Sequence, residues 1–264
     1  MSTQKLMPFW LVLAHMIWIG WCAVAMVWSN AYLLGKCSSQ IGNLEILIFC
    51  GTIFGYHFAQ PDLRLRAIAW IAGVIAGYCF LGVAAPVRSL LLVPFLVWAS
   101  YYGWKWPLRT GLRWSITWKP IVVAFAWAWV TVLLPFKNTP DWPLLLFFCA
   151  RMVFFVALAL PYDLHDRAYD QQRGLSTFAH RLGVSRTLRW MDVAFLMAFT
   201  LNLIQYAVQP FGQMQLLALF LSYCLSSCLL RYLFRQHAPE SGRKILIDAP
   251  MPLQWLFLYF AQGF

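Results

Sequence analysis

The chain consists of long apolar segments separated by short polar ones along almost all of its 264 residues. A hydrocarbon core of about 30 Å requires about 20 apolar residues per helix, and the segments have roughly that length. They are too long for strands and lack the alternation of a membrane β-barrel. We therefore predict one all-α domain over residues 1–264, a polytopic membrane bundle of about nine transmembrane helices. The expected spans are residues 9–31, 43–60, 67–86, 88–104, 118–136, 142–162, 187–208, 213–234 and 251–264.

The composition excludes an ordinary water-soluble domain. Hydrophobic residues make up 62% of the chain and charged residues 11%, against about 45–50% and about 25% in soluble domains. An integral, multi-pass membrane protein is expected instead. The first segment follows Lys5, and we interpret it as a retained helix, with a cleaved signal peptide as the alternative.

The net charge of +11 reflects topology rather than affinity for nucleic acid. Of the 20 Lys and Arg residues, 16 fall in the loops on one side of the predicted bundle. The alternate loops contain only Lys36, Arg88 and Lys137, and Arg151 lies inside a span. Basic loops face the cytoplasm. We therefore expect a cytoplasmic N-terminus, a bacterial inner membrane and no nucleic-acid partner.

Acidic residues gather at the end of the sixth predicted span, in "YDLHDRAYDQQRGLSTFAHRLG" (Tyr162–Gly183). Asp163, Asp166 and Asp170 are three of only nine acids in the chain. If the helix continues through them, their carboxylates fall within an arc of about 60° on one face. Such a cluster suits Mg²⁺ and a diphosphate, but it also fits a solvated helix end paired with Arg167 and Arg173. The spacing alone leaves both interpretations open.

The pattern Asp163-x-x-Asp166-x-x-x-Asp170-x-x-x-Gly174-x-x-Thr177 resembles the second aspartate-rich motif of the UbiA-type membrane prenyltransferases. Arg181-Leu182-Gly183 follows it and Leu160-Pro161 precedes it. The resemblance implies a UbiA-like fold of nine transmembrane helices, with this motif at the cytoplasmic end of the sixth helix. It also implies a partner motif at the end of the second.

The resemblance further implies an enzyme that transfers a prenyl group. In this family two Mg²⁺ ions between the acidic motifs bind the diphosphate of an isoprenoid diphosphate and help it to leave. A lipophilic acceptor, often aromatic, then captures the allylic cation. Such chemistry needs cations at the leaving group and a dry, apolar tunnel. The implied catalytic and metal-binding residues are Asp163, Asp166 and Asp170.

The stretch where the partner motif is expected, "FGYHFAQPDLRLR" (Phe54–Arg66), departs from the family pattern. Its single acid is Asp62, which we predict as a further metal ligand, and His57 is a candidate substrate ligand. Fewer carboxylates weaken Mg²⁺ binding. The protein is therefore either an enzyme with a reduced first site or a relative that has kept the fold and lost the reaction.

Basic residues near the acidic motif are candidates for binding the diphosphate oxygens. Arg151, inside a span, is a separate functional hypothesis, whereas His15 and the cysteines are interpreted as structural. A non-catalytic lipid-binding or assembly protein and a small-molecule transporter remain alternatives. The sequence specifies neither prenyl length, nor acceptor, nor oligomeric state. The candidate diphosphate ligands are Arg64, Arg66, Arg113, Lys119 and Arg173.

Overall fold

The computed structural model describes residues 9–35, 42–58, 62–102, 118–136, 142–172, 177–209, 211–235 and 240–263, in which every regular element is a helix. The all-α prediction is confirmed. The longer helices are α1 (Phe9–Leu33), α2 (Gly42–His57), α3 (Leu63–Gly82), α8 (Trp142–His165), α10 (Phe178–Val208) and α11 (Gln213–Arg235). The shorter ones are α4 (Ala85–Leu90), α5 (Leu92–Tyr102), α6 (Trp118–Ala128), α7 (Leu134–Phe136), α9 (Arg167–Gln172), α12 (Glu240–Asp248) and α13 (Pro250–Phe260).

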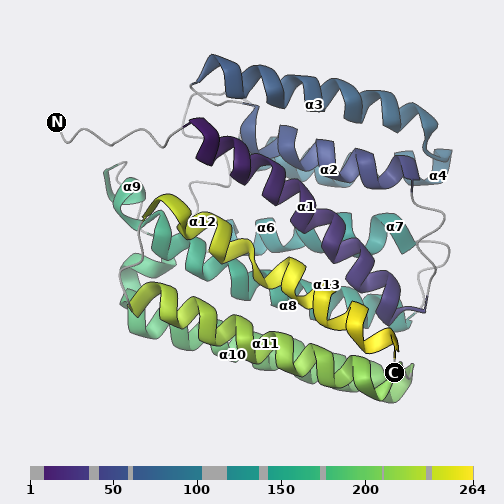
Figure 1. Ribbon diagram of the computed structural model, residues 1–264, viewed down its shortest axis with the longest axis vertical. Helices are drawn as coiled ribbons and strands as arrows, with labels where there is room; N and C mark the ends of the chain where they lie inside the picture. Colours follow the sequence, from purple (N-terminus) through teal and green to yellow (C-terminus); the bar gives the residue numbers. More distant parts are fainter. Residues whose placement is uncertain are drawn as a thin grey trace.

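Six helical segments in the described chain are long and apolar enough to cross a membrane: α1, α3, residues 119–136, α8, α10 and α11. The predicted count of nine is therefore not confirmed. The second expected span forms only the 16 residues of α2. The fourth is interrupted at Leu91, between α4 and α5, and the ninth forms only the 11 residues of α13, which Pro250 begins directly after α12. Figure 1 shows α12 and α13 following one another in a line along the bundle.

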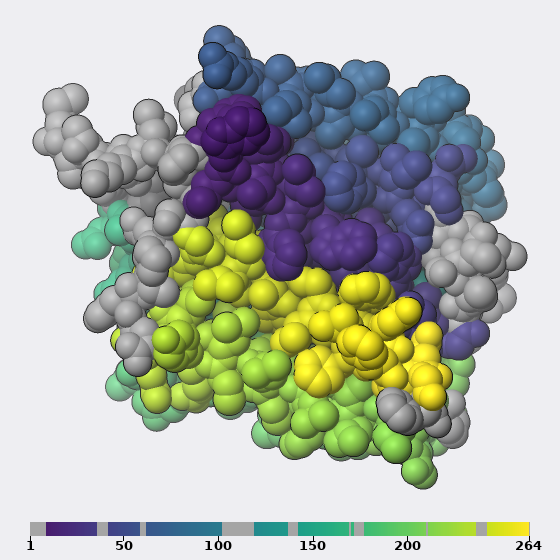
Figure 2. Space-filling model, viewed as in Figure 1, coloured from purple at the N-terminus to yellow at the C-terminus, as the bar shows by residue number. Residues whose placement is uncertain are grey.

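Helix α8 lies at the centre of the packing. It contacts α6, α10 and α12, while α1 packs against α2, α12 and α13. Helices distant in the sequence thus become neighbours: Figure 2 shows the purple N-terminal helix beside the yellow C-terminal segment. The C-terminal helices therefore contribute residues to the same interior as α1 and α8.

The outer helices present large apolar side chains outward. On α3, Trp70, Val74 and Tyr78 are exposed, and on α10 so is Leu196. Exposed apolar surfaces of this extent mark contact with a membrane or a partner. Together with the six long apolar helices, they indicate an integral, multi-pass membrane protein.

Two glycines shape the bundle. A Cβ atom on Gly20 of α1 would lie 2.9 Å from the Phe49 ring and 3.1 Å from the Phe49 backbone oxygen, so glycine permits the close approach of α1 and α2. Gly183 has φ 73° and ψ 171°, a conformation essentially restricted to glycine. It kinks α10, whose first turns are more polar than a membrane span. The predicted span at 187–208 therefore captured only the part of α10 beyond the kink.

Candidate active site

The acidic motif lies where α8 ends and α9 begins. Helix α8 continues through Pro161 and Asp163 to His165, and the chain bends at Asp166 before α9. The hydrogen-bonding pattern of a helix persists across the bend, with Asp166 N donating to Tyr162 O (2.9 Å) and Asp170 N donating to Asp166 O (2.8 Å). Asp163 therefore lies on α8, Asp166 at the bend and Asp170 on α9, rather than all three on the single helix that the sequence prediction assumed.

Lys119 joins two of these acids. Its Nζ lies 2.9 Å from Asp163 Oδ1 and 3.3 Å from Asp170 Oδ2. Lys119 is in the first turn of α6, which packs against α8, so three elements supply the three charges. Asp166 is also close enough to interact electrostatically with Lys119. The ammonium offsets the repulsion of carboxylates that would otherwise be costly to bury together.

Burial distinguishes the three carboxylates. Asp163 is 1% exposed and Asp170 4%, whereas Asp166 is only partly buried. Asp163 Oδ2 has no hydrogen-bond partner among the described residues. A buried carboxylate oxygen normally has a partner, so Asp163 retains one ligand position beyond its contact with Lys119.

The donor chemistry of this cluster fits Mg²⁺, which prefers carboxylate oxygens and substrate phosphate oxygens. The unpartnered Oδ2 of Asp163 supplies such an oxygen. As the described side chains stand, however, no group of three or more His, Cys, Asp or Glu is arranged to hold a metal ion. A metal would therefore complete its coordination with phosphate oxygens and water.

The stretch before α3 is arranged differently from the acidic motif. Asp62 is the N-cap of α3, and its Oδ1 accepts from Arg64 N (2.8 Å) and Leu65 N (3.4 Å). The Asp62, Arg64 and Arg66 side chains are exposed. An aspartate at this position is typical of a helix start. The structure shows this capping role for Asp62, and its metal role stays a prediction.

The remaining candidates fall into two groups. His57 is buried at the end of α2, and its ring meets that of His15 edge to face, with centroids 5.7 Å apart. Arg113 and Arg173 lie outside the described residues, so their predicted contacts with phosphate stay predictions.

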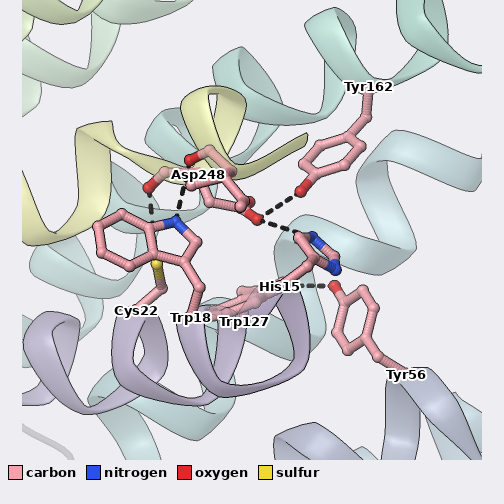
Figure 3. A network of polar contacts seen from close by, with 8 residues as sticks. His15, Trp18, Cys22, Tyr56, Trp127, Tyr162 and Asp248 are labelled. Atoms are coloured by element: carbon pink, nitrogen blue, oxygen red, sulfur yellow. Dashed lines mark hydrogen bonds and ion pairs between the residues drawn. The ribbon is translucent and has the colours of Figure 1, made fainter. Parts of the chain in front are cut away.

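A polar network next to the acidic motif was missed from the sequence. Tyr162, the neighbour of Asp163, donates its hydroxyl to Asp248 Oδ2 (2.5 Å), and His15 Nε2 lies 3.4 Å from the same oxygen. Figure 3 shows these side chains from α1, α8 and α12 converging on Asp248, which is 1% exposed. The only feature of the sequence that pointed to this network was Asp248, an acid just before the last apolar segment. His15, interpreted from the sequence as structural, lies beside Asp248 because α12 packs against α1.

Arg151 faces the interior, as expected for a charged residue inside a span. Its side chain is fully buried, and Nη1 donates to Gln254 Oε1 (2.9 Å) and, at 3.5 Å, to Tyr223 Oη. Its guanidinium also lies 4.8 Å from the centre of the Phe147 ring. No ion pair links it to an acid in the described ranges. Arg151 is therefore held by neutral and aromatic partners.

The fold and the site define a multi-pass helical membrane protein with a lysine-bridged aspartate cluster at one end. The chain belongs to the UbiA prenyltransferase family, whose sequence model matches residues 59–259. No curated protein matches the chain significantly. One similar solved structure is described as "Structural and mechanistic insights into the biosynthesis of Digeranylgeranylglyceryl phosphate synthase in membranes". It has a TM-score of 0.59 and 11% identity, and the match covers 96% of this chain and 99% of that one. At this identity the similarity shows the fold.

Proposed function

We propose that the protein is an Mg²⁺-dependent intramembrane prenyltransferase that moves a polyprenyl group from an isoprenoid diphosphate to an aromatic or other lipophilic acceptor. The acidic cluster is proposed to face the cytoplasm of a bacterial inner membrane, as the distribution of basic loops predicts. Family membership supports the reaction class. The observation that carries the proposal is the bridge from Lys119 to Asp163 and Asp170.

This arrangement suits the recognition of a diphosphate. Lys119 presents an ammonium group beside the carboxylates, and ammonium groups bind phosphate oxygens strongly. Asp163, Asp166 and Asp170 would hold Mg²⁺ through oxygen atoms, among them the unpartnered Asp163 Oδ2. Bound there, Mg²⁺ would supply positive charge that stabilises the leaving diphosphate.

The proposed reaction breaks the bond between the allylic carbon and the diphosphate oxygen. The electron pair leaves with the diphosphate, the acceptor supplies the pair for the new bond, and the acceptor then loses a proton. Lys119 stabilises the charge that develops on the departing oxygens. The apolar interior between α1, α6, α8 and α10 excludes water from the cation.

A second candidate function has specific support. Asp62 is the only acid in the stretch where the family's other motif is expected, and its Oδ1 caps α3. A protein that binds an isoprenoid diphosphate without turning it over, in a lipid-binding or assembly role, would also show this feature. The test must therefore measure binding and turnover separately.

The experiment uses the purified protein in lipid nanodiscs with radiolabelled farnesyl or geranylgeranyl diphosphate, with and without Mg²⁺. Diphosphate release and transfer of label to an extracted lipid fraction report turnover, and equilibrium retention of label reports binding. The test variant is Asp163→Asn. The matched control is Asp192→Asn, which removes an acid that pairs with Arg231 outside the cluster.

We expect turnover that requires Mg²⁺, falls by at least about 100-fold in Asp163→Asn and is preserved in Asp192→Asn. Binding without turnover under all conditions would reject the enzyme and favour the second candidate. Asp62→Asn adds a separate test, because asparagine caps a helix as well as aspartate does. A higher Mg²⁺ concentration for half-maximal turnover in this variant would assign Asp62 to the metal, whereas unchanged kinetics would leave it as a cap.

A further inference from the structure

A cavity outside the acidic cluster opens between α10 and α11. It has a volume of about 270 Å³, and one serine and three arginines are among the residues that line it. Drug-sized ligands occupy pockets of about 300–1,000 Å³, so this cavity, at the lower end of that range, has room for a small polar group. Its lining residues are Val184, Ser185, Leu188 and Arg189 of α10 and Arg231 and Arg235 of α11.

The spacing along the two helices explains why the arginines converge. Ser185, Leu188 and Arg189 lie three and four positions apart, and Arg231 and Arg235 lie four apart, so each set occupies one helix face. Helices α10 and α11 pack against each other. Their facing sides therefore bring cationic groups from both helices to a single cavity.

The positive charge of this cavity is only partly compensated. Arg231 pairs with Asp192, whose Oδ1 also accepts from Ser227 Oγ (2.6 Å). No ion pair involves Arg189 or Arg235 in the part of the chain that the structure describes. Two guanidinium groups thus remain available beside a fixed third one, an arrangement suited to the oxygens of a phosphate group.

The surface next to the cavity is apolar. Along α10, Val193 and Leu196 follow Arg189 at positions four and seven further on, and both are exposed. On α11, Leu221 is exposed, as are Cys224 and Cys228. A charged cavity continued by an apolar helix face matches a molecule with an anionic head and hydrocarbon chains.

We propose that this cavity binds the phosphate head of an anionic phospholipid, with the acyl chains lying along the exposed faces of α10 and α11. The arginines favour a headgroup with net negative charge over a zwitterionic one, whose ammonium they repel. Basic residues near a membrane surface attract anionic lipids in the same way. This inference is independent of the prenyl-transfer reaction.

The test is native mass spectrometry of the full chain released from micelles with equal amounts of phosphatidylglycerol and phosphatidylcholine of identical acyl chains. The test variant is Arg189→Gln, Arg235→Gln. The control is Arg181→Gln, Arg186→Gln, which removes two exposed arginines of α10 that do not line the cavity. Each single variant, Arg189→Gln and Arg235→Gln, is measured in case the double variant does not fold.

We expect wild type and control to retain phosphatidylglycerol in excess. Each single substitution should reduce that excess about fivefold, the effect of one basic side chain near an anionic surface. An equal excess in test and control variants would overturn the proposal. So would binding of inorganic phosphate through Arg189 and Arg235 without lipid preference. Loss of a dimer rather than of lipid in the test variant would also reject it, by assigning this face to a second copy.

Discussion

The ammonium of Lys119 lies 2.9 Å from the carboxylate of Asp163, with both side chains largely withdrawn from solvent. Lys119 is in the first turn of α6 and Asp163 in the last turn of α8, so the pair fixes two helices to each other at the acidic end of the bundle. The same ammonium reaches Asp170 on α9. Lys119 therefore has a structural role, because it holds α6 and α9 against the end of α8, in addition to its proposed role in binding diphosphate.

Lys119→Met should lower both stability and diphosphate binding. Removing one partner of a buried ion pair costs about 3–5 kcal/mol, because the other charge remains buried. We expect a clear decrease in Tm in detergent and loss of diphosphate retention. Lys119→Arg keeps the charge and should preserve more of both. Unchanged Tm in Lys119→Met would show that the pair is not stabilising.

Tyr162→Phe should destabilise the protein without removing a charge. The lost hydrogen bond to the buried Asp248 carboxylate is expected to cost about 1.5–3 kcal/mol. Tyr232→Phe is the matched control, because Tyr232 is 62% exposed. The double variant Tyr162→Phe, Asp248→Asn should lose less unfolding free energy than the sum of the losses in the two single variants. A double-mutant cycle measures this difference. Additive effects would argue against direct coupling.

Gln254→Leu should be more harmful than Arg151→Met, Gln254→Leu. In the single variant Arg151 loses its 2.9 Å acceptor, which should cost about 1–3 kcal/mol. The double variant has no buried cation. It therefore also removes Nε and Nη2 of Arg151, which have no hydrogen-bond partner among the described residues. We expect the double variant to melt at or above the wild-type temperature. A large loss of stability there would mean that Arg151 has a stabilising partner that these contacts do not include.

Gly183→Ala should strain the kink in α10. A side chain at φ 73° and ψ 171° costs about 1–3 kcal/mol, although open space surrounds the position. Gly77→Ala is the control, since this helical glycine also has open space and an ordinary backbone conformation. We expect a lower Tm for Gly183→Ala and an unchanged or higher Tm for Gly77→Ala. Equal melting temperatures would show that α10 can straighten without cost.

The sequence predicted the helical class and most helix positions because membrane spans have a strong, local signal. Long apolar runs such as residues 9–31 and 142–162 correspond to α1 and α8. The prediction was weaker where a helix begins in polar residues, as α10 does, or where a segment is short, as residues 251–264 are, of which only the part to Phe260 is α-helical. Hydropathy does not report such starts and breaks, so the described part of the chain does not confirm the predicted count of nine spans.

The sequence by itself determined the membrane class, the acidic motif and the family resemblance, since these depend on composition and short spacings within one segment. Only the tertiary structure decided that Lys119 bridges Asp163 and Asp170, and that His15 and Tyr162 meet at Asp248. These contacts join residues far apart in the chain. They form because α6, α9 and α12 pack around the end of α8, and no local pattern of apolar and polar residues specifies which helices become neighbours.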